Sequence, residues 1–350
     1  MAEIEIIPDS IIFTKMDDAI YFSEQYKEYI SNSKLSLINP DEGGSIEKFE
    51  EGFKSEYSSS FELGGAIHAS LLQKDLFYIS KFIKPGGKLG IFIEEVFKNR
   101  KLGYSIVECV NLASISADYY KGKLSSNRLK TALKTGFKYY HYLRHEEQIE
   151  RKENFGKCPI YLSDSNYSKY YSCIKTALDN SDVTKFVYPE QLKGSIESFN
   201  EYAILCDIKV TVGDRSIILK IKGKLDNLLI DHDNNIIIIN DLKTTSKPIT
   251  FFMGNRVKVV EEDKSVWKWF DGSFQKYRYY RQIALYSWLA QCAVQQQFGL
   301  IYKTNANMVV LETVPNFQTK VYKVKNAHVK RGIQEFKKLL ADIAIWKMNS

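Results

Sequence analysis

The sequence predicts an α/β (α+β) fold in which a central mixed β-sheet is flanked by helices, with further helices in the first half. Three observations predict it. The first half carries apolar residues at helical spacing, and from about residue 185 short runs rich in Ile, Val and Tyr alternate with turn residues. A long helical segment then separates these runs from two more strand-like runs and a closing amphipathic helix. Helices, a strand meander, a helix and returning strands indicate one layered core with an added helical part.

The elements follow in order along the chain. Helices are expected at 17–29, 60–82, 105–153 and 166–180, with Lys84-Pro-Gly-Gly-Lys88 as a break. Strands are expected at 186–188, 202–212, 216–222, 225–231 and 236–242, joined by turns at Gly213-Asp214 and His232–Asn235. A helix at 272–298, strands at 308–314 and 320–324, and a helix at 327–347 complete the prediction.

Composition excludes several classes of protein. The chain has 49 Lys and Arg against 42 Asp and Glu, and none of its apolar runs approaches the ~20 residues of a membrane span. Its five cysteines form no Cys-x-x-Cys pair, which argues against a disulfide framework or a zinc ribbon. The first residues lack the basic and apolar regions of a secretory signal. We therefore expect a cytoplasmic protein with no membrane partner.

Two carboxylates are predicted to converge at one end of the sheet. Gly223-Lys-Leu-Asp226 precedes Asp241-Leu-Lys243 by fourteen residues, and the intervening turn makes their strands hairpin partners. Side chains alternate along a strand, so Asp241 and Lys243 share a face while Leu242 points into the core. Paired carboxylates suit Mg²⁺ or Mn²⁺, and the lysine suits a water or phosphate beside the metal, a set able to hydrolyse a phosphodiester. The alternative is a solvated ion pair on a strand edge.

These motifs resemble the core of the PD-(D/E)XK nuclease superfamily, specifically its RecB-like exonuclease branch, including phage-type enzymes. Two further segments are similar to signatures of that branch. Gly64-Gly-Ala-Ile-His68 resembles its Gly-x-x-x-His helix, and Gln282-Ile-Ala-Leu-Tyr286 resembles its Gln-x-x-x-Tyr helix. The four motifs stand in the family's order over residues of about 60–80 and 200–290.

The resemblance implies a restriction-endonuclease-like core and a role for each motif residue. His68, Asp226, Asp241 and the Leu242 carbonyl would ligate Mg²⁺ or Mn²⁺, while Lys243 would position the attacking water. Gln282 and Tyr286 would hold the lysine strand and touch the DNA backbone. The alternatives are a core histidine at 68, and a core tyrosine with a surface glutamine on the second helix.

Two further implications concern an extra acid and a cluster. Some members supply an additional acid upstream of the first aspartate, and Glu201 is the candidate here. Other members hold an iron–sulfur cluster on three closely spaced cysteines after the core, but only Cys292 follows Gln282, so no such cluster is expected. No Gly-x-x-x-x-Gly-Lys-[Ser/Thr] motif accompanies the nuclease signature, which argues against a fused helicase.

A basic, aromatic segment leads into Gln282 and is expected to meet DNA. Cations beside exposed rings suit a nucleic-acid strand, since phosphates pair with the charges and bases stack on the rings. The candidate DNA contacts are Gly64, Lys268, Lys276, Arg278 and Arg281. The alternative is a segment of the hydrophobic core whose lysine and arginine side chains extend to solvent.

The sequence therefore suggests a metal-dependent DNA exonuclease acting on linear duplex or single-stranded DNA in recombination or repair. Two alternatives stay open: a structure-specific or CRISPR-adaptation-like endonuclease, and a catalytically inactive DNA-binding subunit. By family analogy a recombinase or single-strand annealing protein and a homo-oligomer are candidate partners. The expected regions are 1–59 (helical), 60–82 (the histidine helix), 83–184 (helical insertion), 185–324 (nuclease core) and 325–350 (terminal helix).

Overall fold

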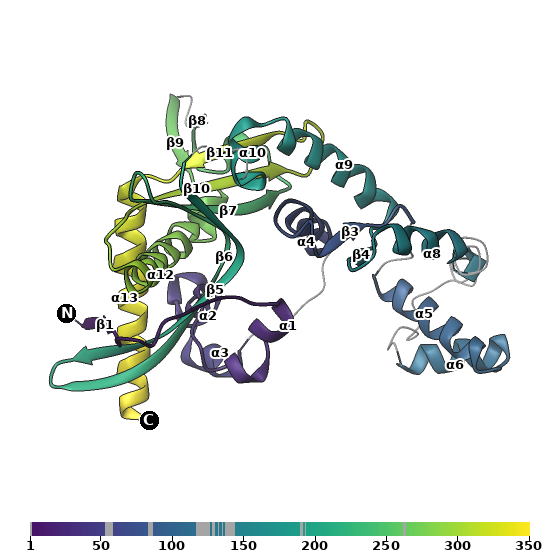
Figure 1. Cartoon of the computed structure of the whole chain (residues 1–350), viewed down its shortest axis with the longest axis horizontal. Coiled ribbons are helices and arrows are strands. Elements are labelled where there is room, and N and C mark those ends of the chain that lie inside the picture. The colour runs from purple at the N-terminus through teal and green to yellow at the C-terminus, as the bar shows by residue number, and fades with distance from the viewer. Residues whose placement is uncertain are drawn as a thin grey trace. The chain divides into compact units, whose positions relative to one another are not determined.

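A computed structural model describes residues 2–52, 59–82, 87–116, 144–189, 194–261 and 264–350, together with residues 127, 130, 131, 133, 134, 136 and 192. The chain divides into two compact units (Figure 1). Met1–Ser55 and Lys175–Ser350 form the first unit, and Glu56–Ile174 form the second. The predicted insertion began at residue 83, whereas the second unit begins at Glu56 and includes the helix that carries His68.

A seven-stranded mixed sheet organises the first unit. Its strands are β1 (Glu3–Ile6), β2 (Ile12–Lys15), β5 (Ile196–Val212), β6 (Arg215–Asp231), β7 (Ile236–Thr245), β10 (Lys303–Glu312) and β11 (Thr319–Lys323). The order is β1-β5-β6-β7-β10-β11, with β2 also on β5. Only β7 and β10 are parallel among these pairs, since a helical crossover joins them. The predicted class, a central mixed sheet flanked by helices, is confirmed.

Two turns set the antiparallel β5-β6-β7 meander. Gly213 and Asn235 have left-handed φ angles of 63° and 52°, the conformation that tight hairpin turns require. The strands expected at 216–222 and 225–231 are one continuous strand, β6, because Gly223 does not interrupt its pairing with β5. The first unit thus has two 17-residue strands side by side.

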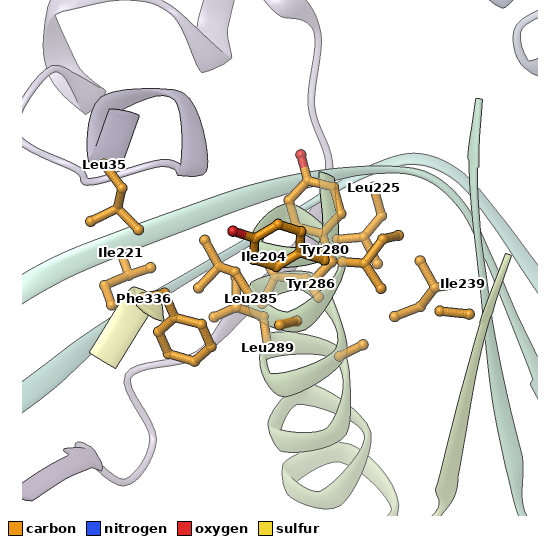
Figure 2. Packing of buried hydrophobic residues seen from close by; sticks show 14 of the residues in the cluster. Leu35, Ile204, Ile221, Leu225, Ile239, Tyr280, Leu285, Tyr286, Leu289 and Phe336 are labelled. Atoms are coloured by element: carbon orange, nitrogen blue, oxygen red, sulfur yellow. The ribbon is translucent and has the colours of Figure 1, made fainter. Parts of the chain in front are cut away.

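Helices α12 (Tyr279–Phe298) and α13 (Asn326–Asn349) supply most of the helical side of the core. Leu285, Tyr286 and Leu289 of α12 point toward Ile221 and Leu225 of the sheet (Figure 2). The two helices cross closely at Gly332, where an added Cβ would lie 2.3 Å from the Tyr280 carbonyl oxygen. That contact leaves no room for a side chain, so glycine fixes the approach of the helices.

Shorter elements complete the first unit. They are α1 (Asp18–Tyr21), η1 (Glu24–Tyr26), α2 (Asn32–Ile38), η2 (Pro40–Glu42), α3 (Ile46–Glu51), α10 (Ser181–Val187), η5 (Ile249–Phe251), β8 (Asn255–Glu261), β9 (Lys264–Phe270) and α11 (Ser273–Lys276). The strand predicted at 186–188 is wrong. The Asn180 side chain accepts a hydrogen bond from the Asp182 N–H, which starts α10, and Val183, Phe186 and Val187 form its buried face.

The second unit is mainly helical. It contains α4 (Ser59–Leu72), β3 (Phe77–Ile79), α5 (Gly87–Lys101), α6 (Ile106–Ser116), α8 (Arg144–Glu153), β4 (Cys158–Ile160) and most of α9 (Asp164–Leu178). The helix predicted at 60–82 ends at Leu72. The residues that follow include β3, which pairs with β4 in a parallel two-stranded sheet. Parts of the helix predicted at 105–153 lie outside the described residues. Among the described helices, none is both long and apolar enough to cross a membrane.

Candidate active site

The central sheet forks where the predicted carboxylates stand. Strands β6 and β7 pair from Asp231 and Ile236 as far as Asn227 and Asn240. Beyond that point β6 stays with β5 while β7 stays with β10. Asp226 and Asp241 are the next residues on the two strands. The Leu242 N–H donates a 2.6 Å hydrogen bond to Asp226 Oδ2, so this carboxylate spans the opening of the fork.

A row of four asparagines crosses the sheet next to the carboxylates. Asn307 donates to Asn240 over 2.9 Å, Asn240 donates to Asn227 over 2.7 Å, and Asn227 donates to Asn200 over 2.7 Å. Asn227 and Asn240 are buried, where an unpaired amide would be costly. The ladder therefore fixes the register of β5, β6, β7 and β10 at the level of the acids.

Glu201 adds a third carboxylate from β5. Asn200 faces Asn227 and Tyr202 faces Leu225, so the register sets Glu201 opposite Asp226. Carboxylate oxygens of Glu201 and Asp226 lie within 4.8 Å of each other. Glu201 has a φ of 58°, a left-handed conformation that is strained for a side chain of this kind. The local backbone is thus distorted where the acid approaches its neighbour.

The surroundings of Glu201 favour its neutral form. Burial and then the Asp226 carboxylate raise the pKa of Glu201 to about 7, although a hydrogen bond from Lys224 opposes them. Lys224 lies 2.9 Å from Glu201 and 2.5 Å from Asp18, so it links the acid to α1. Close carboxylates that resist ionisation together are stabilised by a cation between them.

Lys243 forms an ion pair with Asp241 at 2.5 Å. Burial lowers the pKa of Lys243, but the Asp241 and Asp226 carboxylates outweigh it and raise the pKa above its ordinary value. The ammonium also donates to the Leu242 carbonyl over 3.3 Å and lies 5.3 Å from the centre of the Tyr279 ring. Asp241 and Lys243 are therefore side by side, while Leu242 is buried, as the strand alternation predicts.

Gln282 and Tyr286 face the same region from α12. The Gln282 amide donates to Tyr286 Oη over 3.0 Å, so the two side chains project together. Burial, then Tyr21, then Asp241 raise the pKa of Tyr286 well above its ordinary value. An added Cβ at Gly223 would lie 3.1 Å from the Tyr286 ring. The glycine of the first motif thus lets α12 lie directly on β6, close to the acids.

These groups have the chemistry of a divalent-cation site. Glu201, Asp226 and Asp241 offer hard carboxylate oxygens from three adjacent strands. The Leu242 carbonyl directly follows Asp241 on β7. Mg²⁺ and Mn²⁺ prefer such oxygen ligands. Burial, and then the Asp226 carboxylate, raise the pKa of Glu201, so part of this shift is repulsion that a cation would relieve. The residues present therefore fit a divalent metal.

The predicted histidine lies in the second unit. His68 and Gly64 stand one turn apart on α4, and both are half-buried. Their spacing keeps them on one helical face, as the sequence predicts.

The four candidate DNA contacts of the first unit divide into two groups. Lys268 and Lys276 are exposed, so they stay candidates. Arg281 is fully buried, and its guanidinium contacts Glu42, Glu335, Asn32 and Ser36. The expectation that Arg281 meets DNA is wrong, because buried carboxylates already hold its charge. Arg278 is similarly engaged with Glu335 and Asp41, both at 3.2 Å.

Sequence reasoning missed Lys224, Tyr279 and the asparagine ladder. Lys224 lies inside the Gly-x-x-Asp motif, and two asparagines directly neighbour Asp226 and Asp241 in the sequence. The positions of Lys224 and of these two asparagines next to the motifs could have identified them from the sequence. Their partners Asn200 and Asn307 could not have been identified in this way, because only the sheet order brings them into line.

Comparisons with known proteins give little beyond this geometry. No protein-family model and no curated protein matches the chain. A crystal structure of a "Putative exonuclease" from Eubacterium rectale is similar over 94% of this chain and 85% of that chain, with 13% sequence identity and a TM-score of 0.45.

Proposed function

We propose that this protein is a divalent-metal-dependent deoxyribonuclease of the RecB-like branch, acting as an exonuclease on linear DNA in recombination or repair. Two pairs at the fork of the sheet carry this proposal: Glu201 lies close to Asp226, and Lys243 forms an ion pair with Asp241. The hydrogen bond from the Leu242 N–H to Asp226 joins the strands of the two pairs. Three carboxylates with a lysine two residues after the last are the donor set for metal-assisted phosphodiester hydrolysis.

Asp226, Asp241 and the Leu242 carbonyl would hold Mg²⁺ or Mn²⁺, with Glu201 as a further acid. When bound, such a metal polarises a phosphoryl oxygen and lowers the pKa of water. The half-buried acids already carry repulsion that the cation offsets.

Lys243 has the position and charge to hold the attacking water against the scissile phosphate. Its ammonium pairs with Asp241, donates to the Leu242 carbonyl and lies over the Tyr279 ring. A fixed cation there offsets the negative charge that grows on the phosphate in the transition state. Gln282 and Tyr286 are hydrogen-bonded to each other on α12. Because Tyr286 is buried, we expect it to hold the lysine strand, while the half-buried Gln282 would meet the DNA backbone.

Digestion of end-labelled linear duplex DNA tests the proposal. We expect the protein to release labelled products with Mg²⁺ or Mn²⁺ and none with EDTA. Lys243→Ala should lower the rate by about 10²–10³-fold, because one preorganised charge is lost at the reacting phosphate. Product length and the labelled end give the polarity.

Lys220→Ala is the matched control, because Lys220 is a surface lysine of β6 paired with Glu28 and away from the fork. It should digest DNA at the wild-type rate. Cleavage of closed circular DNA as fast as linear DNA would show that the enzyme is an endonuclease and not an exonuclease. DNA binding without metal-dependent cleavage would instead identify a catalytically inactive subunit and contradict the proposal.

A further inference from the structure

The two-stranded sheet formed by β8 and β9, here called the aromatic ribbon, exposes large rings outside the central sheet. Trp267 is 64% exposed, Trp269 is 56% exposed and Phe270 is 47% exposed. Large apolar side chains left open to water on adjacent residues mark an interaction surface. The ribbon lies between the strand of Lys243 and the helix of Gln282 in the sequence.

The register of the ribbon combines rings with cationic residues. In the backbone register, Trp267 is paired with the position of Lys258, and Trp269 with the position of Arg256. Directly opposed residues share a face of a two-stranded sheet, and alternate residues along each strand share it too. Within 255–261 and 264–270, the positions of this tryptophan face hold no acid, and the first acid after them is Asp271, at the base of the ribbon. Exposed rings at positions that alternate with basic residues of the register fit a ligand with flat rings and phosphates.

The base of the ribbon is fixed tightly. An added Cβ at Gly254 would lie 2.6 Å from the Trp269 ring, and one at Gly272 would lie 2.1 Å from the Phe251 carbonyl oxygen. The Trp269 indole N–H also donates to Asp271 over 3.0 Å. Gly254 and Gly272 therefore allow the base of the ribbon to pack closely against Trp269 and Phe251.

Aromatic contacts connect this base to the candidate active site. Phe252, two residues before Gly254, stacks on Tyr279 with ring centres 5.9 Å apart. The same Tyr279 ring lies 5.3 Å from Lys243 Nζ. Tyr279 also neighbours Tyr277 at 5.8 Å, and Tyr277 is 51% exposed. Exposed and buried rings thus connect the ribbon base to the lysine.

We propose that the tryptophan face of the aromatic ribbon binds single-stranded DNA by stacking its bases on Trp267 and Trp269. Bases of a single strand expose flat faces, whereas bases within a duplex are already stacked on one another. Stacking on an aromatic side chain is sequence-tolerant, and cations along the same surface pair with the phosphates. A protein partner is less suited, because interface cores are depleted of lysine.

Binding of a short oligodeoxythymidine in EDTA tests the proposal without requiring cleavage. The chain has four tryptophans, and Trp288 and Trp346 pack against Phe336 and Phe49. The ribbon tryptophans should therefore dominate quenching of the intrinsic fluorescence by the oligonucleotide. Trp267→Ala should raise Kd about ten-fold, consistent with the loss of one stacked base.

Two variants separate stacking from a structural effect. Trp267→Phe keeps a ring and should restore most of the affinity. Phe155→Ala removes a ring that is 92% exposed in the second unit, and it should bind as the wild type does. Unchanged affinity in Trp267→Ala, or equal competition by a blunt duplex, would overturn the proposal. Because EDTA removes catalysis, an inactive nuclease would leave this result intact.

Discussion

Asp226→Asn should abolish measurable DNA cleavage, a loss of at least about 10²–10³-fold. The carboxylate of Asp226 accepts the Leu242 N–H across the fork and approaches Glu201 within 4.8 Å. Asparagine keeps the shape but removes the negative charge that a divalent cation requires. The rate of release of labelled product from linear duplex DNA measures the effect.

Asp214→Asn provides the control for this change. Asp214 is exposed in the β5–β6 turn, where asparagine is equally favourable. It should retain the wild-type rate, and both variants should show the wild-type circular dichroism spectrum. Cleavage by Asp226→Asn at the wild-type rate would show that Asp226 is not part of the active site.

Arg281→Ala should destabilise the first unit by about 3–5 kcal/mol. Its guanidinium is fully buried and joins α12 to α2, η2 and α13 through Asn32, Ser36, Glu42 and Glu335. Removing it leaves Glu42 and Glu335 mostly buried without their common cation, together with a cavity. Denaturant unfolding followed by circular dichroism measures the loss of unfolding free energy.

The control is Arg215→Ala at the exposed end of β6. Among the described residues, Arg215 donates to the last residues of α13, Met348 and Asn349, at an exposed position, so its removal should cost less than about 1 kcal/mol. Equal destabilisation by the two variants would contradict a structural role for Arg281.

Local patterns in the sequence predicted the parts of the site that lie on one hairpin. Asp226 and Asp241 meet because a turn at residues 232–235 folds two apolar strands together, and both the strands and the turn have clear signals. The Asp-x-Lys spacing likewise places Lys243 beside Asp241. Such inferences need only the period of a strand and the length of a turn.

Features that depend on distant partners were not predictable in this way. Arg281 has the composition of a DNA contact, but Glu42 is 239 residues away in the sequence and turns it into a buried ion pair. The left-handed backbone of Glu201 has no local signal, since glutamate rarely adopts it. The segment 186–188 was misassigned because a short apolar run is compatible with either a strand or a buried helix end.

The claim that the acids at the fork of the sheet hold a divalent metal is tested by measuring Mn²⁺ binding directly. Electron paramagnetic resonance reports the free ion in this titration. We expect saturable binding by the wild type and its loss in an Asp226→Asn, Asp241→Asn double variant that keeps the native circular dichroism spectrum. Asp214→Asn should not change the binding. Equal Mn²⁺ affinity in the wild type and the double variant would show that the forked sheet holds no metal.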